Sequence, residues 1–416
     1  MQSLAGIKVI DISHVIAGPL ASHYLAQLGA SVIKVENPRG GDVMRGGKPG
    51  QGDTPAAFGV FNHGKHSLGI DLKDARARAV LLKLAAAADV FIENFRPGVI
   101  ERLGLDYAAL KAVNPDIIYC SLSGYGQSGE WSGRGAYDHV IQALTGMMMM
   151  AGEEGDAPIK VGFPVVDVAT GMVGAMSILS ALYRRERGGG GQRIDVSMAQ
   201  AAVQLMYPQA AGYLSTGEKP RRVGNRGFSG SPTADTYRCV DGWISTAANT
   251  PAHFRILCGL LGLEHLCGDA RYLDLERFNA EAGGFVVARD LEGLRAVFRA
   301  AFATRSAVAM EAELNAAGVP AARVRHIGEF FDEVQGGAQL TLPLVESAGP
   351  ENVVRTPGIG YDAEPDRPGT AAPAPHLGEH TASVLRWAGL SETEIGELVE
   401  AGVVVLAGQA GALKAP

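Results

Sequence analysis

The sequence is poor in cysteine and has no long apolar run. Its four cysteines, at positions 120, 239, 258 and 267, form no CxxC pair and no cluster with histidine of the kind that binds metal. We therefore expect free thiols in a reducing, cytoplasmic compartment, and no metal site. The stretch 140–151 is apolar but too short to cross a bilayer. Residues 1–13 lack the basic and apolar regions of a signal peptide, so no membrane association is expected.

Charged residues are also scarce, at 19% of the chain, and the formal net charge is -7. Because there is no long basic run, nucleic acid is not expected as a partner. A phosphate-bearing coenzyme needs only a few local arginine and lysine side chains, so this composition does not exclude one. With 47% hydrophobic residues among 416, the chain is expected to be globular and to form two or three domains.

Short runs rich in valine and isoleucine alternate with helical patterns in the first third of the chain. Strands are predicted at 7–12, 31–35, 90–93 and 117–121, with helices between them at 19–28, 75–88 and 107–113. This alternation is typical of an α/β fold with a mostly parallel sheet. We expect a Rossmann-like large domain from 1–198 and 326–416, a smaller α+β domain at 224–320, and linkers at 199–223 and 321–325.

The opening strand, turn, helix and second strand, followed by Glu36, imitate a nicotinamide-dinucleotide domain. The turn, however, reads HVIAGPLAS and has one glycine, Gly18, where that fingerprint needs three. Pro19 also removes an N–H from the start of the helix. An NAD-dependent oxidoreductase is therefore kept only as an alternative.

Asp167 ends an apolar, strand-like run and precedes an apolar helix predicted over 168–187. One interpretation is an N-cap, because an aspartate there accepts hydrogen bonds from free helix N–H groups. The other is a nucleophile, because the positive end of a helix favours an ionised carboxylate. The two interpretations are compatible, and the residue pattern leaves both open.

Several long motifs, in a fixed order, resemble the family III CoA-transferases, the group of formyl-CoA transferase and carnitine CoA-transferase. They begin with LAGIKVIDISHVIAGPLASHYLAQLGASVIKVENPRGGD and continue through FNHGKHSLGIDLK, ADVFIENFRPGVIERLGLDY and the segment around Asp167. They close with GVPAARV and PHLGEHTASVLRWAGLSETEI. The resemblance therefore covers nearly the whole chain.

This resemblance implies an enzyme in which the carboxylate of Asp167 attacks an acyl-CoA thioester. An aspartyl anhydride and then an aspartyl-CoA thioester carry the reaction, with no metal, no nicotinamide and no tightly bound cofactor. Acyl-CoA and a small carboxylic acid are the implied substrates. Two chains threaded through each other as an interlocked homodimer are the implied assembly.

The resemblance also implies a CoA site. Backbone after the first strand would contact the coenzyme, basic residues would reach its phosphates, and the ENFRPG turn would face it. The residues that match are Ile16, Ala17, Arg39, Leu72, Lys73, Asn94, Phe95, Arg96, Arg102 and Tyr137. At Ile16 many relatives have a polar residue, so only a backbone contact is carried over there.

The glycine-rich substrate loop of the family matches only in part, as GNRGFSGSP at 224–232. Gly227 and Gly230 could form a lid over the nucleophile. Arg221, Arg222 and Arg226 lie beside them, and arginine forks recognise carboxylates. We therefore expect a succinyl-CoA-like donor and a small, dicarboxylic acceptor.

An α-methylacyl-CoA racemase is the alternative within the same fold. That branch uses a His-Asp pair, with the histidine in a GHD motif, to move the proton at C2. Here the matching stretch reads AYD, so Tyr137 replaces the histidine, and His139 is two residues further on. On a helix, residues two apart point in different directions.

Overall fold

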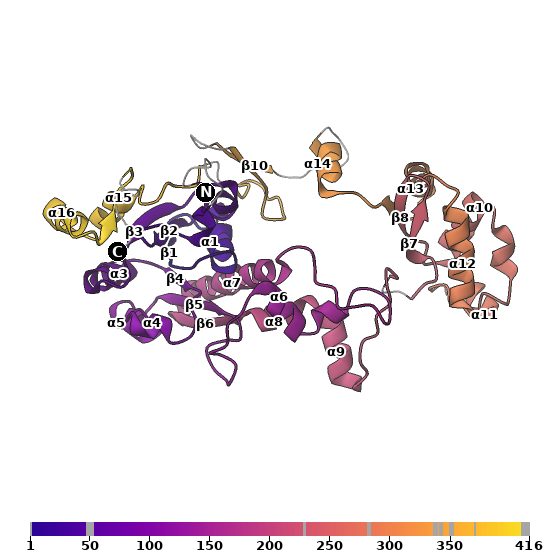
Figure 1. Ribbon diagram of the computed structural model, residues 1–416, viewed down its shortest axis with the longest axis horizontal. Coiled ribbons are helices and arrows are strands. Elements are labelled where there is room, and N and C mark those ends of the chain that lie inside the picture. Colours follow the sequence, from indigo (N-terminus) through magenta and orange to yellow (C-terminus); the bar gives the residue numbers. More distant parts are fainter. Residues whose placement is uncertain are drawn as a thin grey trace. The chain divides into compact units, whose positions relative to one another are not determined.

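The computed structural model describes residues 2–46, 54–227, 230–280, 284–335, 340, 344–348, 353–369 and 372–408. The chain divides into two compact units (Figure 1). The first comprises 1–148, 160–220 and 342–416, and the second comprises 149–159 and 221–341.

A seven-stranded sheet forms the centre of the first unit, in the order β12-β3-β2-β1-β4-β5-β6. Six strands run parallel, and the short edge strand β12 is antiparallel to β3. The strands are β1 Lys8–Asp11, β2 Ser31–Glu36, β3 His66–Ile70, β4 Val90–Glu93, β5 Ile118–Ser123, β6 Gln192–Ser197 and β12 Val404–Val405. The predicted α/β class with a parallel sheet is confirmed.

Helices cover both faces of this sheet, because successive strand side chains point to opposite sides. Val9 packs with one core cluster and Ile10 with the other. The first cluster includes side chains of α1 Ala17–Gln27 and α7 Val165–Arg184. The second includes those of α3 Ala75–Ala86, α5 Tyr107–Val113, α15 Thr381–Trp387 and α16 Glu392–Glu400.

Shorter elements complete the first unit. They are η1 Val43–Arg45, α2 Ala56–Asn62, α4 Val99–Arg102, α6 Asp138–Leu144, η3 Arg185–Gly189, α8 Met198–Leu205, α9 Tyr207–Thr216 and the hairpin of β10 Leu344–Ala348 with β11 Val353–Pro357. The short helix η2 Met147–Met149 includes the last residues of the segment 1–148 and the first residue of the second unit.

The second unit is a small α+β arrangement with its own core. Three antiparallel strands, β7 Ala234–Cys239, β8 Gly242–Ala247 and β9 Ala321–Arg323, carry an aromatic cluster in which Tyr237 stacks on Phe302 at 4.4 Å between ring centroids. Its helices are α10 Pro251–Leu261, η4 Glu264–Gly268, α11 Leu275–Phe278, α12 Leu291–Phe302, α13 Ala307–Ala316 and α14 Ile327–Gln335.

The unit boundaries differ from the expected domains at three segments. Residues 199–220, expected as a linker, belong to the first unit and contain α8 and α9. Residues 149–159, expected in the large domain, belong to the second unit, where the buried Arg222 guanidinium donates to the carbonyls of Ala151, Asp156 and Ala157. Residues 321–341 also belong there, because arginines next to β9 pair with acids on α13 and α14. The Arg222 bonds join residues 65 to 71 positions apart, so local sequence patterns do not reveal them.

One described helical stretch, Val165–Gly189, is long and apolar enough to span a membrane by length and composition. Half of its apolar window is buried within the protein. Ile178 and Leu182 pack in the same core cluster as the side chains of α1. Core packing therefore accounts for much of its apolar character.

Candidate active site

The carboxyl ends of the parallel strands gather most of the predicted site residues at one edge of the sheet. The turn 13–16 follows β1, Asn94 to Arg96 follow β4, Arg39 follows β2, and Lys73 follows β3. Ligands of open α/β sheets bind outside this edge, because the loops there diverge from neighbouring strands. The fold itself therefore places the predicted CoA residues on a single side.

A close approach between β1 and α1 shapes the start of this edge. A Cβ atom at Gly18 would lie 2.2 Å from the Ser13 Oγ, so only glycine fits there. The single glycine of this turn therefore serves helix packing in this structure, and no triple-glycine pyrophosphate cradle is formed.

A pocket of about 330 Å³ opens at this edge, within the first unit. Backbone and side chains from the ends of β1, β4 and β5 meet the first turn of α7 there. Its lining consists of Val15, Ala17, Asn94, Phe95, Arg96, Pro97, Leu122, Ser123, Gly124, Ser132, Arg134, Ala136, Tyr137, Asp167, Thr170 and Met198.

Asp167 reaches this pocket from inside the helix, not from its cap. Helix α7 begins at Val165, so the expected strand-like approach and the N-cap role of Asp167 are wrong. The cap comes from Asp138 in the first turn of α6. Its Oδ2 accepts the N–H groups of Val166 at 2.8 Å and Asp167 at 3.0 Å. Because Asp138 takes over capping, no described residue donates a hydrogen bond to the Asp167 carboxylate.

The electrostatics of Asp167 also differ from the expectation of an aspartate kept strongly ionised by the helix. Burial, followed by the negative charge of Asp138, raises the pKa of Asp167 to about 6. Both effects favour the neutral carboxyl group, whereas the field of a helix start would favour the ionised one. The group is therefore mostly ionised at neutral pH but is more basic than an exposed aspartate.

Two guanidinium groups lie on the pocket wall. Arg96 follows β4, and Arg134 lies in the loop after β5, with its guanidinium 4.7 Å from the centre of the Trp131 ring. Both side chains are exposed. The sequence prediction included Arg96 but missed Arg134. The feature of the sequence that could have identified Arg134 is the stretch SGRGAYD, which contains Tyr137 and has a basic residue between two glycines.

The remaining predicted CoA residues divide between the pocket and the surface near it. Ala17, Asn94, Phe95, Arg96 and Tyr137 line the pocket with Asp167, and Tyr137 is 70% exposed. The other predicted residues are not part of its lining: Ile16, Arg39, Leu72, Lys73 and Arg102. Of these, Arg39, Lys73 and Arg102 are exposed, which leaves their side chains free to reach a ligand longer than the pocket.

The predicted substrate loop lies in the second unit. Gly227 donates its N–H to the Ala234 carbonyl at 2.6 Å, and Gly230 has a positive φ of 69°. The Arg226 Nε donates to the Val223 carbonyl at 2.9 Å. Arg222 is buried against backbone carbonyls, so its guanidinium is not presented to a carboxylic acid as expected.

The arrangement gives little support to a His-Asp proton-transfer pair. The pocket lining, taken over the described residues, includes a tyrosine but no histidine. His139 is exposed, and its ring stacks on that of Tyr137 at 6.3 Å. Nor does any group of three or more His, Cys, Asp or Glu in the described ranges have the placement to hold a metal ion.

Comparisons with known proteins agree with this geometry. Residues 4–381 match CoA-transferase family III. The succinate–glutarate CoA-transferase of Agrobacterium fabrum is 35% identical, over 92% of this chain and 94% of that relative. The acetyl-CoA:oxalate CoA-transferase of Acetobacter aceti is also 35% identical, over 91% and 94%.

Solved structures extend the likeness to three dimensions. A CAIB/BAIF family protein from Brucella suis has a TM-score of 0.80 and 31% identity, over 93% of this chain and 99% of that one. The chain therefore belongs to CoA-transferase family III and is an enzyme that transfers CoA.

Proposed function

We propose that this enzyme moves CoA from a succinyl-CoA-like donor to a small dicarboxylic acid, with Asp167 as the carboxylate that carries the acyl group. The observation that carries the proposal is a semi-buried carboxylate, without a described hydrogen-bond donor, on the wall of a pocket that also holds Arg96 and Arg134. Relatives named for glutarate, oxalate and mesaconate support the dicarboxylic class.

The proposed chemistry proceeds through two covalent forms of Asp167. A carboxylate oxygen attacks the thioester carbonyl, the C–S bond breaks, and CoA leaves as a thiolate from a mixed anhydride. The thiolate then attacks the Asp167 carbonyl, which releases the donor acid and leaves an aspartyl-CoA thioester. The acceptor carboxylate attacks this thioester to form a second anhydride and free thiolate. Attack of the thiolate on the acceptor's carbonyl yields the new acyl-CoA and restores Asp167.

The surroundings of Asp167 suit this cycle. Anhydrides and thioesters hydrolyse, so partial burial protects them. A carboxylate with a raised pKa is also a better nucleophile than an exposed one, provided that it remains ionised. Backbone at Ala17 and the turn of Asn94 to Arg96 are proposed to contact CoA, and Arg39, Lys73 and Arg102 its phosphates.

A donor and acceptor panel tests the substrate class. With succinyl-CoA as donor, kcat/KM for glutarate as acceptor is expected to be about tenfold or more above kcat/KM for pentanoate. The two acids have the same number of carbons, but only glutarate offers a second carboxylate to a guanidinium. Arg134→Gln is expected to lower the ratio of kcat/KM for glutarate to kcat/KM for pentanoate. Arg76→Gln, at an exposed ion pair with Asp74 outside the pocket, serves as the control. A preference for long-chain or aromatic monocarboxylates would contradict the proposal.

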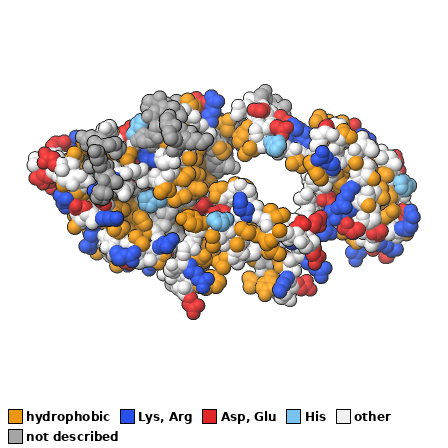
Figure 2. All heavy atoms as spheres, viewed as in Figure 1, with side chains coloured by type: hydrophobic (Ala, Val, Ile, Leu, Met, Phe, Trp, Pro, Cys, Tyr) orange, Lys and Arg blue, Asp and Glu red, His pale blue; other side chains and the backbone are white. Residues whose placement is uncertain are grey.

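We also propose that the enzyme is a cytoplasmic homodimer whose two chains interlock. The proposal is supported by large apolar side chains that α7, α8 and α9 leave exposed in the single chain. They are Met172, Met176, Tyr183, Val203, Leu205, Tyr207, Tyr213 and Leu214. Hydrophobic side chains are visible over α8 and α9 in Figure 2. A second copy of the chain would bury them.

Interlocked chains cannot separate without unfolding, so the dimer is expected to persist on dilution. Sedimentation and light scattering from micromolar to low nanomolar concentration should give one unchanged dimer mass in native buffer. Active monomer at any dilution would rule out interlocking. A monomer at all concentrations would rule out the dimer itself.

A further inference from the structure

A strained turn forms the wall of the pocket directly after β1. Val15 has a φ of 70° and is the one non-glycine residue in the described ranges with a positive φ. Valine is β-branched, and its side chain here is 39% exposed, so burial of the side chain does not explain the strain. Strained backbone persists only where surrounding groups hold it, and it gathers at functional sites.

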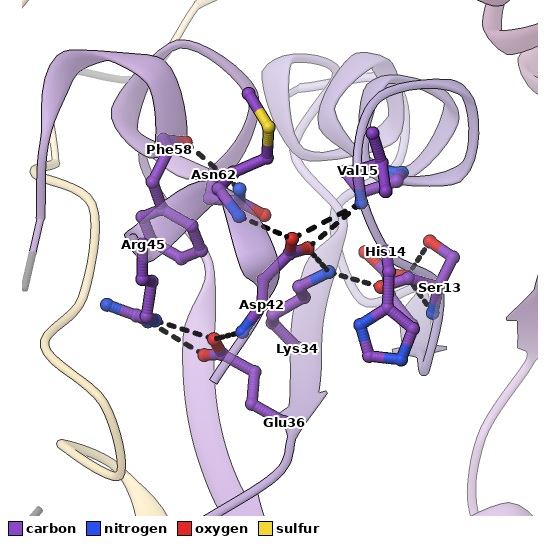
Figure 3. Close-up of polar contacts among 12 residues, drawn as sticks. Ser13, His14, Val15, Lys34, Glu36, Asp42, Arg45, Phe58 and Asn62 are labelled. Atoms are coloured by element: carbon purple, nitrogen blue, oxygen red, sulfur yellow. Dashed lines mark hydrogen bonds and ion pairs between the residues drawn. The ribbon is translucent and has the colours of Figure 1, made fainter. Parts of the chain in front are cut away.

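Three side chains distant in sequence from this turn hold it by its backbone, and two of them, Lys34 and Asp42, are labelled in Figure 3. The Asp42 carboxylate accepts the Val15 N–H, at 3.2 and 3.3 Å from its two oxygens. Asn94 accepts the His14 N–H at 2.8 Å and donates to the His14 carbonyl at 2.7 Å. The Lys34 ammonium donates to the Ser13 carbonyl.

Asp42 is itself fixed in a buried network of charges. Its side chain is fully buried and lies 3.0 Å from the Lys34 Nζ. Its own N–H donates to Glu36, which is paired with Arg45 (Figure 3). Burial alone would raise the pKa of Asp42, but Lys34 and the Met44 N–H hold that pKa below its usual value. The Asp42 carboxylate is therefore a charged acceptor, held by its neighbours, for the N–H of Val15, the residue of the pocket wall with the strained φ.

We propose that Asp42 is a positioning residue for CoA transfer, which acts by locking the Val15 turn in the conformation that receives CoA beside Asp167. The inference rests on the proposed function of this pocket. Without the lock, Val15 should relax to a negative φ, which displaces the backbone of the turn that lines the pocket. Only the fraction of molecules with the left-handed turn would then bind CoA well, and the apparent Kd would rise in inverse proportion to that fraction.

The test is a double-mutant cycle measured by calorimetric binding of CoA to the full-length protein. Asp42→Ala removes both oxygens that accept the Val15 N–H. It is expected to raise the Kd about tenfold or more, because a strained φ of this kind is disfavoured by about five- to a hundredfold. In a Val15→Gly background the same change should raise Kd by no more than about twofold, since glycine adopts a positive φ without strain. KM for acyl-CoA should follow the same pattern. This rescue separates positioning from a merely structural role.

Asp89→Ala is the matched control. Asp89 also accepts a backbone N–H, from Lys8 at 2.7 Å, and pairs with a cation, Arg185 at 2.8 Å. It lies before β4, at the opposite edge of the sheet, so its replacement should leave Kd for CoA unchanged.

Two results would overturn the inference: a folded Asp42→Ala protein with native Kd, or an equal loss in both backgrounds. If Asp42→Ala does not fold, the melting temperature of Val15→Gly decides. Relief of strain should raise it by a few degrees, and an unchanged or lowered value overturns the strained-turn argument. A wild-type protein that does not bind CoA would instead remove the proposed function and this inference together.

Discussion

Asp167→Asn is expected to lower CoA transfer on the order of a thousandfold or more, because the amide lacks the nucleophilic oxygen pair. The fold should survive, since Asp138 and not Asp167 caps α7. Wild-type enzyme incubated with donor acyl-CoA and treated with hydroxylamine should carry a hydroxamate on the peptide that contains Asp167. Initial rates and mass spectrometry provide the two measurements.

The same variant should also gain stability at neutral pH. The pKa of Asp167 is about 6 in the fold, against 3.8 for a free aspartate side chain. A raised carboxylate pKa means that the fold favours the neutral form, so stability is lost as pH rises from about 4 through 6. Asparagine cannot ionise, and the gain at pH 7.5 should be at most about 2–3 kcal/mol.

Asp106→Asn is the control for both measurements. Asp106 is also an aspartate at a helix start, where it accepts the Ala109 N–H at 2.9 Å, but it lies outside the pocket lining. It should retain full activity. A folded Asp167→Asn enzyme with near wild-type transfer would refute the nucleophile assignment, and a hydroxamate on the peptide of Asp138 would move that role there.

The rate of transfer is expected to fall tenfold per pH unit below about pH 6. In the proposed mechanism Asp167 of the free enzyme must be ionised to attack, and its pKa is about 6. The measurement is kcat/KM for acyl-CoA between pH 4.5 and 8.5. At pH 4.5 the expected loss is therefore about thirtyfold relative to the plateau.

The variant Asp138→Asn tests whether the ionisation of Asp167 causes this fall in kcat/KM at low pH. Burial is the larger cause of the raised pKa of Asp167, and the charge of Asp138 is the second. Removing that charge should lower the pKa of Asp167, so the fall in kcat/KM should begin at a lower pH. The remaining amide oxygen can still accept the N–H groups at the start of α7. A fall in rate that begins near pH 7 and is unchanged in the variant would point instead to Glu93, whose pKa burial raises to about 7.

Much of the first unit could be predicted from local pattern. The strand at 90–93 and the helix at 107–113 have the predicted bounds, and the sheet is parallel as the alternation indicated. The prediction failed at the start of α7, which begins at Val165 and not at Val168. The reason is that Asp138, almost thirty residues earlier, supplies acceptors for its first N–H groups.

The candidate site also combines residues that sequence motifs identified with one residue that they missed. Motifs selected Ala17, Asn94, Arg96, Tyr137 and Asp167, and the carboxyl edge of the sheet brings them to one pocket. Arg134 was missed because a basic residue in a glycine-rich loop has no periodicity to mark it. The loop 224–232 was selected as a lid, but its part in the site stays a prediction.

The sequence by itself determined the family and the α/β class, and it singled out Asp167 as the carboxylate that we propose to carry the acyl group. Those properties depend on residue order and on local periodicity. Only the tertiary structure decided that Asp138 caps α7, that the pKa of Asp167 is raised, and that Asp42 holds Val15 at a positive φ. Each of these depends on burial and on contacts between residues far apart in the chain, where the energy of a charge or a hydrogen bond is set by the neighbours that folding supplies.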